Sequence, residues 1–171
     1  EFNNYNYEAQ HYGTFTANRG ELATPQFDDI LKALPGAQRQ AANAGYPGAM
    51  WGRIVLNHYN GPVPTNFPPP KVSGKKNRSA LGNDQLDAPA FLAMNFLYAY
   101  ETTLDRTFLE KKAYPMVRAC MDFYTDYLTL NVEKNRYELQ RSAAREGTSD
   151  NNPAYPLAFI KRLAIAAADY S

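Results

Sequence analysis

Residues 87–128 read DAPAFLAMNFLYAYETTLDRTFLEKKAYPMVRACMDFYTDYL and contain two successive patterns of helical spacing. The first begins at Asp87-Ala88-Pro89, a capping residue ahead of a proline, and extends to about Thr103. The second begins at Asp105, the cap of a further helical region that Pro115 breaks or restarts. The two patterns are separated by a short polar step, so this stretch predicts a pair of helices.

Helical patterns also occur on both sides of this pair. Thr24-Pro25 predicts a helix start, with a hydroxyl cap and proline at the first helical position, and Pro35-Gly36 predicts a break or kink in that helix. A last helix opens at Pro153 or Pro156, and residues 131–139 predict a short hairpin. Strands and helices do not alternate, so the sequence predicts an all-α fold.

Residues 45–82 form a connection rich in glycine with six prolines. Its one strongly apolar run, Ile54-Val55-Leu56, predicts a short strand. A structureless loop of this length is uncommon inside a compact domain and is usually functional or disordered.

Charge and composition exclude several classes of protein. Eighteen Lys and Arg against 17 Asp and Glu give a net charge of +1, which argues against an electrostatic nucleic-acid binder. No stretch approaches the roughly 18 apolar residues that a membrane span needs. Cys120 is the single cysteine, which excludes an internal disulfide framework and a Cys-based zinc cage. His11 and His58 lie far apart, so we expect no metal and no cofactor.

Three patches together resemble a known family. The first joins residues 4–13, NYNYEAQHYG, to residues 18–22, NRGEL; the second joins LDRTFL at 104–109 to AYPM at 113–116 and FYTDYL at 123–128; the third joins Asn152-Pro153 to LAFIKRL at 157–163. In this order they resemble the (α/α)6-barrel glycoside hydrolases of family 95, which include α-L-fucosidases and α-L-galactosidases. The resemblance covers the chain from Asn4 to the last helix.

The resemblance implies an inverting glycosidase, in which a carboxylic acid protonates the leaving oxygen while water attacks the opposite face. Asn4 and Asn6 match the family's Asn-x-Asn motif, whose amides orient that water. Residues two apart in an extended segment point to the same side, which suits this task. Glu146 matches the general acid, although Arg145 would lower its pKa if the two paired. The loop is shorter than the family's, and Asp150 is the alternative acid.

The resemblance also implies sugar-binding residues and a second carboxylate. We expect the substrate to be contacted by His11, Tyr12, Trp51 and His58, although core packing is the favoured explanation for Trp51, and also for Tyr46, when each is taken singly. The tyrosines of the non-helical segments are expected to face the same cleft: Tyr5, Tyr7, Tyr12, Tyr46 and Tyr59. The family's base comes late in the barrel, and we find no candidate here, because Asp84 and Asp87 are better explained as loop and cap residues.

An (α/α)6 toroid alternates inner and outer helices around a closed ring, and these helical segments account for about half of it. We therefore expect one partial catalytic domain over residues 1–171, with 45–82 as a loop at the cleft. Its expected partners are a carbohydrate substrate and the remaining part of the same barrel, and the resemblance implies a periplasmic or secreted location. Two other hypotheses stay open: a non-catalytic carbohydrate-binding or degenerate barrel, and a glycoside phosphorylase.

Overall fold

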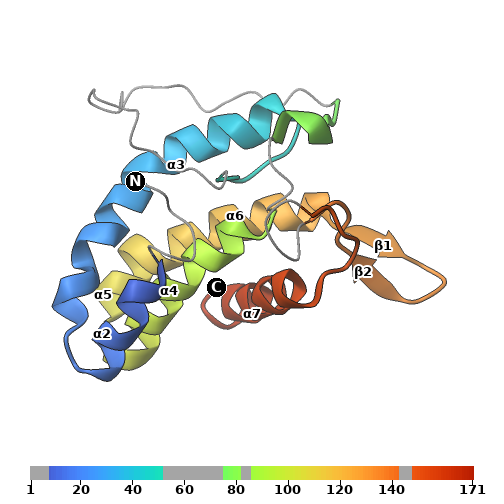
Figure 1. Ribbon diagram of the computed structural model, residues 1–171. Helices are drawn as coiled ribbons and strands as arrows, with labels where there is room; N and C mark the ends of the chain where they lie inside the picture. Colours follow the sequence, from blue (N-terminus) through green and yellow to red (C-terminus); the bar gives the residue numbers. More distant parts are fainter. Residues whose placement is uncertain (1–7, 52–74, 82–85, 143–147) are drawn as a thin grey trace.

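The computed structural model describes residues 8–51, 75–81, 86–142 and 148–171. The fold is all-α with one hairpin, as predicted, and Figure 1 shows the arrangement. Its long helices are α3 (Thr24–Asn43), α4 (Ala88–Thr103), α6 (Tyr114–Tyr127) and α7 (Ala154–Asp169). Short helical turns precede the first long helix or connect the later ones: η1 (Ala9–His11), α2 (Tyr12–Thr16), η2 (Gly20–Ala23), η3 (Arg78–Leu81), α5 (Arg106–Phe108) and the π-helical turn η4 (Leu109–Ala113). The predicted hairpin is confirmed as β1 (Thr129–Asn131) paired antiparallel with β2 (Arg136–Glu138).

Helix α4 lies at the centre of the fold. Eleven of its 16 residues are buried, and it packs against α2, α6 and α7. Its sequence is apolar nearly all the way round, which is typical of a helix enclosed on several sides. Figure 1 shows α4 and α7 running in the same direction and α6 in the opposite one. The core therefore forms between two antiparallel pairs, α4 with α6 and α6 with α7, and one parallel pair, α4 with α7.

Two of the three predicted side-chain caps are absent. Asp105 does cap its helix, because its Oδ1 accepts from the amides of Thr107 at 2.8 Å and Phe108 at 3.1 Å. The prediction for Thr24 is wrong, since η2 leads directly into α3 and puts Ala23 at the cap position. Asp87 occupies the cap position of α4, but its side chain makes no capping bond.

Neither internal proline ends its helix. Pro35 lies inside α3, which continues past it and is bent in Figure 1, so the kink is confirmed and the break is wrong. Pro115 lies in the first turn of α6, directly after η4. A proline ring lacks an N–H and crowds the carbonyl four residues earlier, which belongs here to Lys111. The wider π turn accommodates this mismatch, so the helix continues.

The segment that follows α3 folds back onto α6. The amide of Ala49 donates to the carbonyl of Ala119 at 2.9 Å. Gly48 has a φ of 71°, and a Cβ there would lie 2.3 Å from the backbone nitrogen of Phe123. Only glycine permits this approach, which carries Trp51 into the core. No helix in the described part of the chain has both the length and the apolar character that a membrane crossing requires.

Candidate functional site

Helices α4 and α7 begin at the same end of the fold (Figure 1). In the chain, residues 44–87 separate α3 from α4 and residues 128–153 separate α6 from α7, so each of these two helices follows a long connection. At the opposite end, α4 and α5 are joined by only Leu104 and Asp105. Binding and catalytic residues are commonly carried by loops that a rigid scaffold positions. The candidate site is therefore sought at the start of α4 and α7.

Four of the predicted site residues lie outside the described residues: Asn4, Asn6, His58 and Glu146. The structure describes His11, Tyr12 and Trp51. His11 is half-buried at the start of α2, and this burial lowers its pKa. Tyr12 meets the ring of Tyr98 edge-on, with 5.8 Å between the ring centroids. His11 and Tyr12 thus belong to the N-terminal entry to the fold.

Two aromatic residues of the long connection are core residues. Trp51 is 2% exposed, and its indole N–H has no partner among the described residues. Tyr46 is also buried and packs against Phe123 and Tyr127, which agrees with core packing, the favoured explanation for this residue, and not with a place on the cleft wall. The Lys76 ammonium lies 5.3 Å from its ring centroid. An aromatic residue packs inward when its connection folds back onto a helix, which the sequence pattern of 45–82 does not reveal.

Two buried carboxyl groups lie at the start of α4, and our assignment of Asp87 as a cap missed this. Glu8, directly before η1, is 1% exposed, and Asp87 is 5% exposed. Burial, followed by the nearby charge of Asp87, raises the pKa of Glu8 to about 8. Burial also raises the pKa of Asp87, against the opposing effects of its own backbone N–H and a hydrogen bond from the Tyr155 hydroxyl. The two carboxyl groups thus link the N-terminal segment, α4 and α7.

The side-chain amide of Asn95 links the backbone of Glu8 to the side chain of Gln26. The Asn95 Nδ2 of α4 donates to the backbone carbonyl of Glu8 at 3.3 Å and to Oε1 of Gln26 at 3.0 Å. All three residues are buried. We name the set Glu8, Gln26, Asp87 and Asn95 the buried polar cluster. Its signal in the sequence was weak: Glu8 lies two residues after Asn6, and Asn95 interrupts an otherwise apolar helix face.

The connection that contains Glu146 is closed at its base. Ser142 and Asp150 exchange two backbone hydrogen bonds, of 2.9 and 2.8 Å. Outside them, Oδ1 of Asn152 accepts from the Leu139 amide at 2.8 Å, and the Asn152 amide donates to the Leu139 carbonyl at 2.7 Å. Asp150, the alternative acid, accepts a 2.7 Å bond from the Thr148 hydroxyl. These bonds hold the two ends of the connection together.

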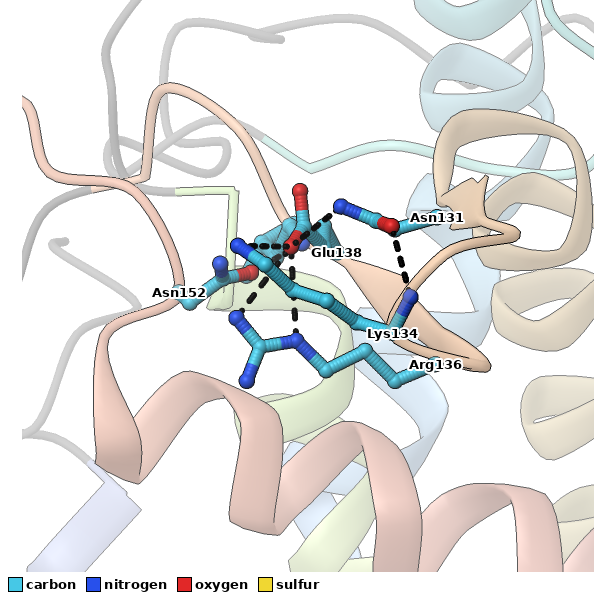
Figure 2. A network of polar contacts seen from close by, with 6 residues as sticks. Asn131, Lys134, Arg136, Glu138 and Asn152 are labelled. Atoms are coloured by element: carbon cyan, nitrogen blue, oxygen red, sulfur yellow. Dashed lines mark hydrogen bonds and ion pairs between the residues drawn. The ribbon is translucent and has the colours of Figure 1, made fainter.

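The hairpin before this connection carries a second polar network (Figure 2). Asn131, Lys134 and Arg136 converge on Glu138, with Asn152 beside it. Arg136 reaches the Glu138 carboxylate with Nε at 3.3 Å and Nη2 at 3.2 Å. We name Asn131, Lys134, Arg136 and Glu138 the hairpin network. It leads directly into the base of the Glu146 connection.

A cavity of about 350 Å³ lies elsewhere, between α6, α7 and Tyr137 of the hairpin. Its lining is mostly apolar: Met121, Thr125, Leu128, Tyr137, Leu157, Ile160, Lys161 and Ala164. It contains none of the predicted site residues. Within residues 8–51, 75–81, 86–142 and 148–171, no three His, Cys, Asp or Glu side chains are placed to hold a metal ion.

Comparison with known proteins identifies one family. The model of the glycosyl hydrolase family 95 catalytic domain matches residues 2–161, nearly the whole chain. No curated protein sequence matches the chain.

Proposed function

The chain belongs to glycosyl hydrolase family 95 and forms part of its (α/α)6 catalytic toroid, and we propose that it carries half of the active site of an inverting exo-glycosidase. The proposed substrate ends in a sugar such as α-linked fucose or galactose. The observation that supports this best is that α4 and α7, each of which follows a long connection in the chain, begin at the same end of the fold.

In the proposed mechanism, Glu146 protonates the glycosidic oxygen as the bond to the sugar breaks. Asn4 and Asn6 orient the water that attacks the anomeric carbon from the opposite face, so the product has the inverted configuration. A base takes the proton from that water, and we propose that the rest of the toroid supplies it. His11, Tyr12, Trp51 and His58 are proposed to border the sugar, although the burial of Trp51 favours a packing role.

We also propose that the remaining helices of the barrel pack against α7. Only four of its 16 residues are buried, and Ile165 and Tyr155 expose 46% and 39% of their surface. A separate side of α7, formed by Leu157, Ile160 and Ala164, lines the apolar cavity that it shares with α6. In a closed ring each helix has neighbours on both sides, and α7 packs on α4 and α6 here. The family resemblance further supports a periplasmic or secreted location.

The decisive experiment compares Glu146→Gln with wild type in the complete enzyme. On an alkyl or sugar leaving group, we expect kcat to fall by about 10²- to 10⁴-fold, the usual contribution of a general acid. On an aryl glycoside whose leaving group needs no proton, the loss should be much smaller. Glu138→Gln is the matched control, since it removes a carboxylate shortly before the same connection and should leave kcat unchanged.

Four outcomes would redirect the proposal. If Glu146→Gln were as active as wild type on both leaving groups, the acid assignment would be wrong. Sugar binding without turnover by the complete protein would favour a non-catalytic barrel. Turnover that requires inorganic phosphate would favour a phosphorylase. Proton NMR of the first-formed product reports the anomeric configuration, and retention would exclude inversion.

A further inference from the structure

The side chain of Arg78 joins the two long connections of the chain. Arg78 is the first residue of η3, in the connection between α3 and α4. Its Nη1 donates to Oε1 of Gln140, in the connection between α6 and α7, at 2.6 Å, and its Nη2 lies 3.5 Å from the Thr129 hydroxyl of β1. The guanidinium also covers the ring of Tyr127, with 4.8 Å to the ring centroid. Arginine suits this position because its planar group can stack on a ring and donate from a fixed fork at the same time.

Gln140 is held a second time, through its backbone. The Tyr127 hydroxyl donates to the Gln140 carbonyl at 2.9 Å. Tyr127 is the last residue of α6 and is 2% exposed, so its ring is part of the core. We name Arg78, Tyr127 and Gln140 the arginine triangle, since each of the three contacts the other two. Of the two residues that hold Gln140 in this triangle, Arg78 is the one that comes from the first long connection.

The segment that carries Arg78 is itself anchored to the ends of α3 and α6. The Asn77 amide donates to the Ala44 carbonyl, directly after α3, at 2.8 Å. The Lys76 ammonium donates to the backbone carbonyl of Asp126 at 3.1 Å and pairs with its carboxylate at 2.9 Å. A cation is favourable there, because the last carbonyl groups of a helix carry partial negative charge. The segment is therefore a fixed base from which the arginine side chain extends.

Gln140 lies within the base of the connection between α6 and α7. Before it, Leu139 is bonded twice to Asn152, and after it, Ser142 is bonded twice to Asp150. These two pairs bring the outgoing and returning halves of the connection together. A contact that fixes Gln140 thus fixes the point at which the two halves meet.

We propose that Arg78 is a positioning residue, which holds this base in place through Gln140 and so couples the two long connections to one another. Its effect on the base is independent of the proposed function, whereas its effect on turnover rests on it, because the proposed general acid belongs to this connection. Without Arg78, the Tyr127 bond is left to hold Gln140, and the base opens more often. An acid that is held less firmly slows the departure of a leaving group that needs a proton, and matters little for one that does not.

The first test measures the base of the connection and needs no activity. Arg78→Met keeps an unbranched apolar side chain but removes the guanidinium, and Gln140→Met removes the acceptor. Hydrogen exchange of the complete enzyme, resolved to single amides by mass spectrometry, follows Ser142 and Asp150, whose amides donate to each other's carbonyl groups. Protection of both amides should fall by about threefold to tenfold in each variant, the range that one hydrogen bond supports.

Two comparisons separate this bond from a general loss of stability. Lys112→Met is the matched control, because it removes a cation from a 2.7 Å ion pair with Asp28 that joins η4 to α3, and it should leave the protection at the wild-type level. In the double variant Arg78→Met/Gln140→Met, the second substitution should add little to the first, since both remove the same bond. Additive losses in the double variant, or unchanged protection in both single variants, would overturn the proposal.

The same variants are then assayed for turnover at a temperature at which all are folded. With an alkyl or sugar leaving group, kcat of Arg78→Met should fall by about tenfold with little change in KM, and with an aryl leaving group by less than about twofold. Arg78→Lys, which keeps a donor, should recover part of the loss, and Lys112→Met should match wild type on both substrates. An equal loss on both leaving groups would overturn the positioning role. A complete enzyme that is inactive on every glycoside would refute the proposed function, and the exchange at Ser142 and Asp150 would still decide the role of Arg78.

Discussion

The buried polar cluster and the hairpin network hold carboxylates in opposite surroundings. Glu8 and Asp87 are 1% and 5% exposed and face tyrosine and amide groups. Glu138 retains 17% of its side-chain surface and lies between Lys134 at 3.8 Å and Arg136 at 3.2 Å. Lys134 and Arg136 lie against the carboxylate at the hairpin, whereas burial raises the pKa of both carboxyl groups in the cluster. The comparison teaches that the pKa of a carboxyl group follows the burial and charge of its surroundings in the fold.

The largest difference between the buried polar cluster and the hairpin network should appear in how their carboxyl groups make stability depend on pH. The pKa of Glu8 rises from 4.5 in an exposed carboxyl to about 8 in the fold. Between these values the unfolded chain has released a proton that the folded chain retains, so stability falls as pH rises. The slope from this group approaches about 1.4 kcal/mol per pH unit, and the raised pKa of Asp87 adds in the same direction.

Urea unfolding of wild type and Glu8→Gln from pH 4 to 9 measures this effect. The free energies of unfolding should diverge above pH 4.5, with the variant more stable, and the gap should stop growing above pH 8. Glu138→Gln should run parallel to wild type. A constant gap between wild type and Glu8→Gln across the whole range would contradict the assignment.

Removing an amide from each network should give the next largest difference. Asn95→Leu keeps the volume of the side chain but leaves the Glu8 carbonyl and Gln26 Oε1 without their donor. Each unpaired buried acceptor costs about 1–3 kcal/mol, so we expect a loss of about 3 kcal/mol. Asn131→Ala, in the hairpin network, should cost below about 1 kcal/mol. Chemical unfolding of the two variants at one pH checks the ranking, and equal losses would refute it.

An intermediate loss of stability is expected when Asn152 is changed. It accepts a bond from the buried Leu139 and has a φ of 55°, which is strained for most residues. We expect Asn152→Ala to lower the free energy of unfolding by about 2 kcal/mol, because both the bond and the backbone preference are lost. Asn152→Gly keeps the backbone preference and should cost less. A glycine variant less stable than the alanine variant would show that the left-handed conformation is not the cause.

The smallest effect is expected for the charge at the hairpin. Glu138→Gln removes contacts to partly exposed cations, which are screened by water and salt. The free energy of unfolding should fall by less than about 1 kcal/mol at low ionic strength, and 1 M salt should reduce the change further. Thermal unfolding at the two salt concentrations measures it. A loss that salt does not reduce would indicate that Glu138 acts by shape rather than charge.

The fold class and the limits of most helices can be predicted from the sequence. The helix from Asp87-Ala88-Pro89 to about Thr103 is confirmed as α4, and the hairpin at 131–139 is confirmed by β1 and β2. Local signals suffice there, because helix periodicity and a turn depend on neighbouring residues. Asp87 shows where they fail: its place ahead of Pro89 indicates a cap, yet its side chain turns toward Glu8 and Tyr155.

The sequence by itself therefore determined the all-α architecture, the family and the order of the motifs. The predicted roles of Asn4, Asn6 and Glu146 stay predictions, because these residues lie outside the described part of the chain. Only the tertiary structure decided that Glu8 meets Asp87 and that Trp51 and Tyr46 enter the core. The physical reason is that burial and charge proximity depend on residues distant in sequence, here brought together where Glu8 contacts Asn95 of α4 and Tyr155 of α7 contacts Asp87.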